Sequence, residues 1–220
     1  MSIADQVRAR GISEVVHFTT NRGLVGMLAS GYLYSRHQLS DDKYLEHQWM
    51  ANSAFRPESA EGFDKKENWI DYVNMSISEI NSRFLLVSSR WHQDSDYWWV
   101  ILSFDPIIMS GLGVYFATTN NGYDLCNRAI GEAGFESLFI PEVRRKPPSW
   151  RALRGSREPH LPTCEQAEVL YPGKVSLQAL RKVYVREGEQ ADRVEGWLRE
   201  FRMTRVEVIV SDQKFVGKAN

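Results

Sequence analysis

The segment PTCEQAEVLY, residues 162–171, joins a strand-forming run to polar side chains that a protein core does not accept without partners. Its Val, Leu and Tyr favour a strand, and the Pro-Gly pair that follows ends it. Because side chains alternate between the two faces of a strand, Gln166 and Glu168 are expected on one face. An amide and a carboxylate that share an inward face need either buried partners or a function. A structural glutamate bonded to the backbone or to a buried arginine is one explanation, and a ligand cleft is the other.

The overall composition is that of a soluble globular protein. The chain has 220 residues, of which 43% are hydrophobic and 25% charged, and this suits a single domain over residues 1–220. A formal net charge of -1 gives no overall positive field, so only local patches can attract nucleic acid. The first residues contain no apolar signal region, and the sequence contains no run of about 18 apolar residues. We therefore expect a cytoplasmic protein without a membrane partner.

The N-terminal part predicts a strand followed by a capped helix. EVVHFT, residues 14–19, reads as a strand with His17 and Thr19 on the same face. NRGLVGMLASG follows as a helix that Thr20 or Asn21 caps and a glycine ends.

The remaining elements indicate a mixed α+β fold. Residues 37–68 show little periodicity and are predicted as a long loop with one helical turn near 44–51. A short turn or helix is expected at Asp105-Pro106, and residues 144–157 are expected to be irregular. Further strands are predicted at 69–77, 83–89, 97–104, 113–118, 180–187 and 206–210, and helices at 123–133, near 136 and at 190–201. These elements do not alternate regularly, so mostly antiparallel, mixed connections are expected.

Several well-known kinds of site are absent from the sequence. Gly111 and Gly113 lack the third glycine of a dinucleotide-binding loop, and no P-loop or GxSxG motif occurs. The histidines show no HxxxH spacing and the DSD at 94–96 lacks the glycine of a calcium loop, so no metal is expected. Cys126 and Cys164 are far apart in the sequence and are typical of structural thiols in a reducing compartment. Two cysteines are also enough to form one disulfide, so that alternative stays open.

Gln166 and Glu168 form a candidate catalytic pair. A carboxylate beside a breaking glycosidic bond stabilises an oxocarbenium-like transition state more than the ground state. The same carboxylate can deprotonate an incoming nucleophile, which a neighbouring amide can position. A metal-dependent nuclease is the competing interpretation, and such enzymes commonly have a lysine two residues after the acid on the strand. Leu170 occupies that position here, which argues against a nuclease.

Three blocks of the sequence resemble the DarT-like ADP-ribosyltransferases, in the order found in that family. VVHFTTNRGLVGMLASGYLYSR resembles their opening His-x-Thr strand, Asn-started helix and Leu-x-Ser element. DYVNMSISEIN resembles their next strand, and EQAEVLYPGKV resembles the segment with their catalytic glutamate. Each block is unspecific alone, but together they span residues 14–186.

The resemblance implies a mono-ADP-ribosyltransferase fold with NAD as co-substrate and no metal. Two small packed sheets, mixed or antiparallel and flanked by helices, would hold NAD in the cleft between them. The implied catalytic residues are Glu168, Gln166 as the nucleobase-orienting partner, and an arginine from the loop after the first helix. In the family this arginine contacts the diphosphate of NAD and the nucleic acid. We assign the role to Arg56, with Arg36 as the alternative. The other implied NAD contacts are His17, Thr19, Asn21, Tyr72, Asn74 and Ser76.

The activity that the resemblance implies is transfer of ADP-ribose to a nucleobase in single-stranded DNA or RNA. Many family members are toxins, so a toxin–antitoxin or phage-defence role is implied, with an antitoxin that hydrolyses the mark or blocks the cleft. VNMSI is closer to the guanine-modifying branch, and residues 37–68 differ from the thymidine-modifying members. An RNA-modifying relative fits equally well, so the base and the type of nucleic acid stay open. Transfer to protein and a catalytically silent nucleic-acid-binding module are the alternatives.

A basic segment precedes the Gln-Ala-Glu motif. Residues 144–157 contain no acid and include Trp150 among the basic residues Arg144, Arg145, Lys146, Arg151, Arg154 and Arg157. Such a patch attracts phosphates, and an indole can stack on an unpaired base. We expect this segment to contact nucleic acid; a solvated loop or a surface covered by an acidic partner is the alternative.

Overall fold

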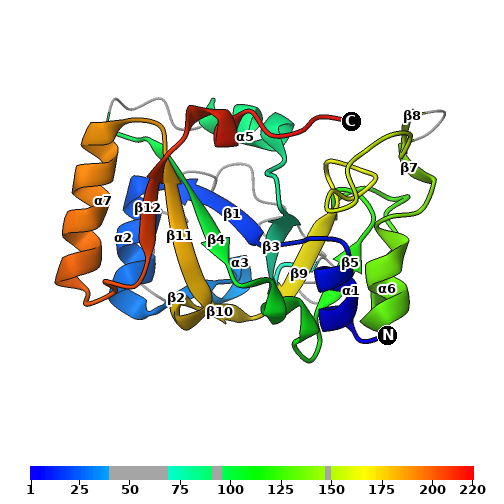
Figure 1. The fold of residues 1–220 in the computed structure, drawn as a ribbon, viewed down its shortest axis with the longest axis horizontal. Coiled ribbons are helices and arrows are strands. Elements are labelled where there is room, and N and C mark those ends of the chain that lie inside the picture. The colour runs from blue at the N-terminus through cyan, green and yellow to red at the C-terminus, as the bar shows by residue number, and fades with distance from the viewer. Residues whose placement is uncertain (40–68, 91–95, 147–149) are drawn as a thin grey trace, which may run out of the picture.

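The computed structural model describes residues 1–39, 69–90, 96–146 and 150–220. Within these ranges, eight strands form one sheet in the order β12-β11-β4-β1-β3-β9-β5-β6 (Figure 1). Neighbouring strands are antiparallel except for β11 and β12, which are parallel. The strands of this sheet are β1 (Val15–Thr20), β3 (Tyr72–Ile77), β4 (Trp99–Phe104), β5 (Tyr115–Ala117), β6 (Arg128–Ile130), β9 (Glu168–Pro172), β11 (Leu180–Val185) and β12 (Glu207–Val210). Two antiparallel pairs of strands lie outside it, β2 (Tyr32–Tyr34) with β10 (Lys174–Ser176), and β7 (Glu142–Lys146) with β8 (Trp150–Leu153).

Helices cover both faces of the β12-β11-β4-β1 part of the sheet. On one face, Leu24 and Val194 pack into a core that includes Val183 of β11. On the other face, Leu85 and Phe215 pack against Ile101 of β4. The helices are α1 (Ile3–Ala9), α2 (Asn21–Ser30), α3 (Arg36–Leu39), α5 (Ser82–Ser89), α6 (Gly131–Ser137) and α7 (Gly188–Glu200), with short 3-10 helices η4 (Pro106–Ser110), η5 (Leu177–Ala179) and η6 (Asp212–Phe215).

The predicted capped helix after the first strand is confirmed as α2. The Thr20 hydroxyl accepts a hydrogen bond from the Gly23 amide at 3.1 Å, which satisfies a backbone donor of the first turn. Gly31 ends the helix with φ 76°, a left-handed conformation that glycine adopts without strain. Leu24 and Met27 are buried at helical spacing, so α2 lies with its apolar side on the sheet.

The sheet is split between β1 and β3. β1 pairs with β4 along all of its length, but it pairs with β3 only at Val15–Ile77 and Val16–Ser76. One four-stranded part (β12-β11-β4-β1) therefore diverges from the other (β3-β9-β5-β6). This confirms the predicted α+β fold, and the two expected sheets are these two parts joined at a short seam.

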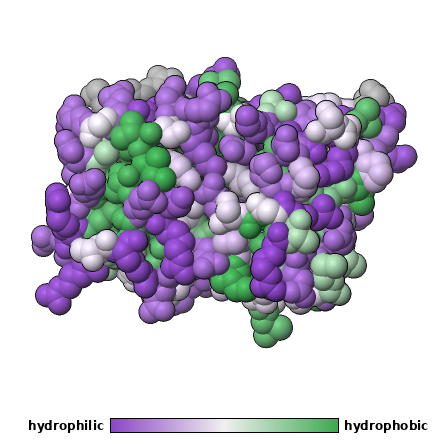
Figure 2. Space-filling model, viewed as in Figure 1, coloured by the Kyte–Doolittle hydropathy of each residue, from purple (hydrophilic) through white to green (hydrophobic). Residues whose placement is uncertain are grey.

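The surface in the orientation of Figure 1 is mostly hydrophilic, with a hydrophobic patch beside α7 and β12 (Figure 2). In the described part of the chain, no helix combines the length and the apolar character that a bilayer crossing requires.

One predicted strand is wrong, and another begins later than predicted. Residues 83–89 form α5 instead, because the Asn81 side chain accepts a hydrogen bond from the Phe84 amide at 3.1 Å and caps a helix that buries Leu85. Residues 162–167 form turns, and β9 begins only at Glu168. The Ala167 amide donates to the Cys164 carbonyl at 3.0 Å rather than to a neighbouring strand.

Two further assignments need correction. Residues 123–133 were expected to be helical, but they form turns and β6, and the helix α6 starts only at Gly131. Residues 144–157 were expected to be irregular, but much of this segment belongs to the β7–β8 pair. The predicted helical turn at 44–51 lies outside the described residues.

Candidate active site

A cleft of about 420 Å³ lies where β1 and β3 diverge. It is lined from both parts of the split sheet and by side chains of β2, α3 and α5. Six of the predicted site residues meet there: His17, Thr19, Arg36, Tyr72, Asn74 and Glu168. The lining also includes Thr20, Tyr34, Phe84, Trp99 and Asn120.

Glu168 is the carboxylate of this cleft, at the first residue of β9. Its Oε2 accepts hydrogen bonds from Asn74 Nδ2 at 3.0 Å and from the backbone amide of Asn121 at 2.8 Å. The two donors approach one oxygen from β3 and from the loop after β5. They fix the orientation of the carboxylate without covering it, since Glu168 remains partly exposed to the cleft.

Burial raises the pKa of Glu168 to about 7, against the two hydrogen bonds and the positive charge of Arg128, which lower it. A carboxyl group with this pKa exchanges protons readily near neutral pH. Perturbed carboxyl groups in a cleft are typical of active sites.

Arg128 of β6 holds the loop that reaches Glu168. Its guanidinium donates to the side-chain oxygen and to the backbone carbonyl of Asn121, and to the Cys126 carbonyl at 3.1 Å. The guanidinium also lies 5.3 Å from the centre of the Trp69 ring. The Asn121 amide is thereby held in position for Glu168.

His17 lies at the split between the strands. Its Nδ1 is 2.9 Å from the Asn74 carbonyl, which can only accept, so Nδ1 carries the proton. Burial lowers the pKa of His17, only partly opposed by this hydrogen bond, and the ring is therefore neutral at pH 7 with Nε2 as an acceptor. The imidazole joins β1 to β3 at a point where the backbone pairing has ended.

A smaller cavity of about 100 Å³ shares one wall with the cleft. His17, Phe18, Asn74, Phe84 and Glu168 line both spaces. The smaller cavity adds polar side chains from Ser76 and Asn81, so the predicted site residue Ser76 faces this cavity rather than the main cleft.

Two predicted site residues, Asn21 and Gln166, lie elsewhere. Asn21 supports the start of α2, where Nδ2 donates to the Asp96 carbonyl at 2.9 Å and Oδ1 accepts from the Trp98 amide at 3.3 Å. Gln166 was predicted to share a strand face with Glu168, but it lies in the turn before β9 and is buried, so that prediction is wrong. Arg56 lies outside the described residues.

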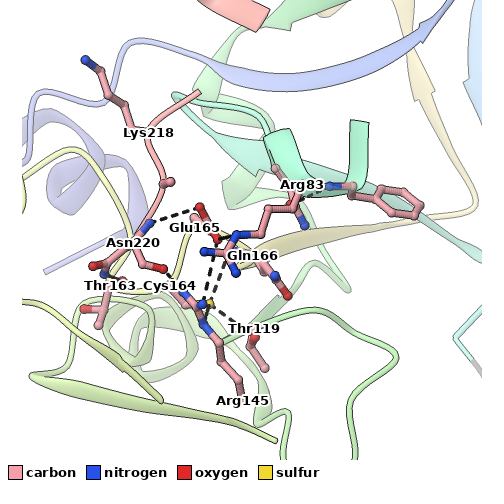
Figure 3. A network of polar contacts seen from close by, with 12 residues as sticks. Arg83, Thr119, Arg145, Thr163, Cys164, Glu165, Gln166, Lys218 and Asn220 are labelled. Atoms are coloured by element: carbon pink, nitrogen blue, oxygen red, sulfur yellow. Dashed lines mark hydrogen bonds and ion pairs between the residues drawn. The ribbon is translucent and has the colours of Figure 1, made fainter. Parts of the chain in front are cut away.

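The basic segment is only partly available to a ligand (Figure 3). Arg145 has an exposure of 1%, which contradicts its predicted contact with nucleic acid. Arg145 Nη1 lies 3.9 Å from Glu165 Oε1, and Arg145 Nε donates to Cys164 Sγ at 3.2 Å. The same Glu165 oxygen lies 2.9 Å from Arg83 Nε. The Asn220 amide donates to the other oxygen of Glu165 at 3.1 Å.

Two more arginines of this segment serve the fold. Arg154 donates to the carbonyls of Leu161 and Glu158, and Arg157 donates to those of Pro162 and Lys218. Among the predicted nucleic-acid contacts whose exposure the structure describes, Arg144, Trp150 and Arg151 are exposed, and Arg151 forms an ion pair with Glu142 at 3.1 Å. Lys146 is the last residue of β7. Cys126 and Cys164 are buried free thiols.

Sequence reasoning missed Asn121 and Arg128, because their role depends on how the loop after β5 folds back on β9. The Asn120-Asn121-Gly122 sequence is a turn signal that was available, but the segment after it was assigned to a helix.

Known proteins resemble this chain in sequence and in fold. A family model described as "ssDNA thymidine ADP-ribosyltransferase, DarT" matches residues 16–216. The solved structure of Thermus sp. 2.9 DarT in complex with carba-NAD+ is similar with a TM-score of 0.59 and 16% identity, over 90% of this chain and 95% of that chain. The same protein in complex with ADP-ribosylated ssDNA has a TM-score of 0.58 and 17% identity, over 91% and 95% of the two chains.

A third structure is that of Thermosipho africanus DarTG in complex with ADP-ribose, with a TM-score of 0.58 and 13% identity. The match covers 94% of this chain but only 52% of that one, so this chain spans about half of its length. Among curated proteins, none matches this sequence.

Proposed function

The chain belongs to the DarT family of ssDNA thymidine ADP-ribosyltransferases, and we propose from this premise that it transfers ADP-ribose to a base of single-stranded DNA. As a member of this family it is an NAD-dependent ADP-ribosyltransferase. The observation that carries the assignment of its site is Glu168, a carboxylate in the cleft that two donors orient and whose pKa is about 7.

The side chains of the cleft fit a dinucleotide. Tyr34, Tyr72 and Trp99 offer flat apolar surfaces for the two ring systems, and Arg36 offers a cation for the diphosphate. Thr19 and Asn74 supply hydrogen-bonding groups for ribose hydroxyls. A pocket with apolar walls and a few polar groups that fix orientation is the usual form of a cofactor site.

The roles of the residues follow from their positions. Bound NAD supplies a glycosidic bond that breaks with its electron pair on nicotinamide, which leaves an electrophilic anomeric carbon. Ionised Glu168 stabilises the positive charge that develops on the ribose. The same carboxylate accepts the proton that the attacking nitrogen loses when it forms the new bond to the anomeric carbon. His17 and Asn74 are positioning residues that keep β1, β3 and Glu168 in register.

We assign thymidine as the target base. The family description names it, and a relative is known in complex with ADP-ribosylated ssDNA. Within a DNA strand, the only ring N–H of thymine is N3–H, which requires a base of the kind that Glu168 provides. The DarTG name of one relative supports a toxin role for this chain, with a partner that reverses the mark or blocks the cleft.

The test is mass spectrometry of mixed-sequence single-stranded DNA, RNA and duplex DNA after incubation with the protein and NAD. The expected result is a gain of one ADP-ribose on single-stranded DNA, with fragmentation that places it on thymidine. Glu168→Gln should abolish the gain, and Glu200→Gln, an exposed change on α7, should not. A gain on RNA alone, or NAD consumption without any modified strand, would contradict the proposal.

A further inference from the structure

A row of planar side chains leads from the protein surface to Glu168. Trp150 is 39% exposed, and the centre of its ring lies 5.8 Å from the guanidinium carbon of Arg83. The next residue, Phe84, is 42% exposed and lines both the cleft and the smaller cavity. Its ring centre is 5.7 Å from that of Phe18, which also lines both spaces. The row therefore ends at the wall that contains Glu168.

The helix that contributes to this row exposes three large apolar side chains. Phe84, Leu86 and Val87 of α5 are all more than 40% exposed, although buried positions are the rule for such residues. Of these three side chains Phe84 lines the cleft, and an exposed apolar side chain at the edge of a functional cleft is typical of a binding surface.

The charge around the row is strongly positive. Among residues 82–90, 142–145 and 150–154, the structure describes one acid, Glu142, and six basic residues: Arg83, Arg90, Arg144, Arg145, Arg151 and Arg154. Glu165 is held at 2.9 Å by Arg83 and at 3.9 Å by Arg145, so one carboxylate meets two guanidinium groups. The Arg83 side chain is still 51% exposed. An anionic partner is favoured over a neutral or cationic one.

We propose that the acceptor strand crosses α5, with one base stacked on Trp150, a phosphate on Arg83, and the target base beside Phe84 in the smaller cavity. This inference rests on the proposed function, and it adds the surface that brings the strand to Glu168. Alternating aromatic and guanidinium groups suit an unpaired strand, because its bases expose their flat faces whereas those of a duplex are stacked on each other. Ser76 and Asn81 supply polar groups to the target base in the smaller cavity.

The assignment changes the predicted nucleic-acid surface. Arg145 and Arg154 support the surface from within, whereas Arg83 and Phe84 of α5 form part of it. Residues 83–89 were predicted as a strand, and that prediction did not place them beside Trp150.

The test measures strand binding separately from transfer. Fluorescence anisotropy with a labelled mixed-sequence single-stranded DNA is measured in the Glu168→Gln background, where no turnover occurs. We expect Trp150→Leu and Phe84→Leu each to weaken binding about tenfold, because each removes one stacking ring and keeps an apolar side chain. Trp150→Phe should retain most of the affinity. Leu153→Ala, at a 58% exposed position of the same strand β8, is the matched control and should bind as the parent does.

The charge is tested through the salt dependence of binding. Arg83→Gln should reduce the slope of log affinity against log salt by about one, as expected for the loss of one phosphate contact. Arg202→Gln is an exposed change two residues after α7, and α7 lies at the opposite end of the molecule from the β7–β8 pair (Figure 1). This variant should leave the slope unchanged. Thermal unfolding of each variant identifies any loss of fold.

Two results separate this inference from the proposed function. If Trp150→Leu, Phe84→Leu and Arg83→Gln are folded and bind within twofold of the parent, the proposed surface is wrong even though transfer to DNA occurs. If binding depends on these residues but the protein with Glu168 intact modifies no strand, the surface is correct and the proposed transfer is wrong.

Discussion

Arg128 and Asn121 are joined twice, because the guanidinium donates both to the side-chain oxygen and to the backbone carbonyl of Asn121. The Asn121 amide in turn donates to Glu168 at 2.8 Å. The cation is thus linked to the carboxylate through a loop that it holds in place. Arg128 also lowers the pKa of Glu168 through its charge.

Replacing Arg128 by Gln should raise the pKa of Glu168 further. Both the positive charge and the anchored amide donor, each of which lowers the pKa of Glu168, are then weakened. The acidic limb of the pH profile of transfer should therefore move to higher pH. Arg128→Lys keeps the charge but not the paired donors, and it should give an intermediate profile. A loss of rate without any shift of the profile would contradict this role.

The unmodified protein should itself show a pH-dependent activity. With a pKa of about 7, Glu168 is mostly protonated below that pH and cannot accept a proton. We expect kcat/KM for NAD to rise with pH up to about 7 and to fall roughly tenfold for each unit below it. The measurement is the initial rate of nicotinamide release with single-stranded DNA present. A rate that is constant between pH 5 and pH 8 would exclude Glu168 as the essential base.

Glu168→Gln should also change stability, in a direction that depends on pH. The folded pKa of about 7 lies above the unfolded value, so between pH 4.5 and 7 the folded chain binds a proton that the unfolded chain lacks. Protonation then favours folding, and the stability of the unmodified protein falls as the pH rises through this window. The variant lacks this titration. It should be more stable by about 1–3 kcal/mol at pH 8, with a smaller gain at pH 5.

Urea unfolding at the two pH values measures this difference. Equal stabilisation at pH 5 and pH 8 would show that the folded pKa of Glu168 is not raised.

Parts of this site were predictable from local sequence. Thr20 and Gly31 define α2 through capping, and the alternation of β1 places His17 toward the cleft. Glu168 could be found because a carboxylate at the start of an apolar strand requires an explanation. The helix α5 was not found, because a short apolar run such as RFLLVSS fits a strand or a helix equally well. Its cap, Asn81, was the local signal that distinguished the two.

Other parts depend on contacts between distant segments. Arg145 seemed free because its own segment contains no acid, but Glu165 lies twenty residues further along the chain and neutralises it. Gln166 seemed to share a face with Glu168 because the motif was interpreted as one continuous strand. The hydrogen bonds of the preceding turn, such as that from Thr163 to Leu138, are not visible in the sequence.

Glu165→Gln should destabilise the fold rather than the reaction. Glu165 has 2% side-chain exposure, and its loss leaves the buried Arg145 without its carboxylate. Breaking a buried pair in this way commonly costs about 3–5 kcal/mol. Replacing Arg145 by Met in the same protein should recover part of that loss, as urea unfolding would show. If the single variant is as stable as the parent, Glu165 does not hold this part of the fold together.

His17 is expected to matter both for stability and for NAD binding, because its imidazole replaces the backbone pairing that β1 and β3 lack beyond Val16. His17→Ala leaves the Asn74 carbonyl without this donor, and we expect a loss of about 1–2 kcal/mol in urea unfolding. The freed β3 would also let Asn74 move away from Glu168, so the KM for NAD should rise together with a fall in kcat. His17→Gln retains a side-chain donor of similar reach and should recover stability more than activity, because it cannot reproduce the planar ring at the cleft. Recovery of both to the same extent would mean that His17 only joins the strands and takes no part in holding NAD.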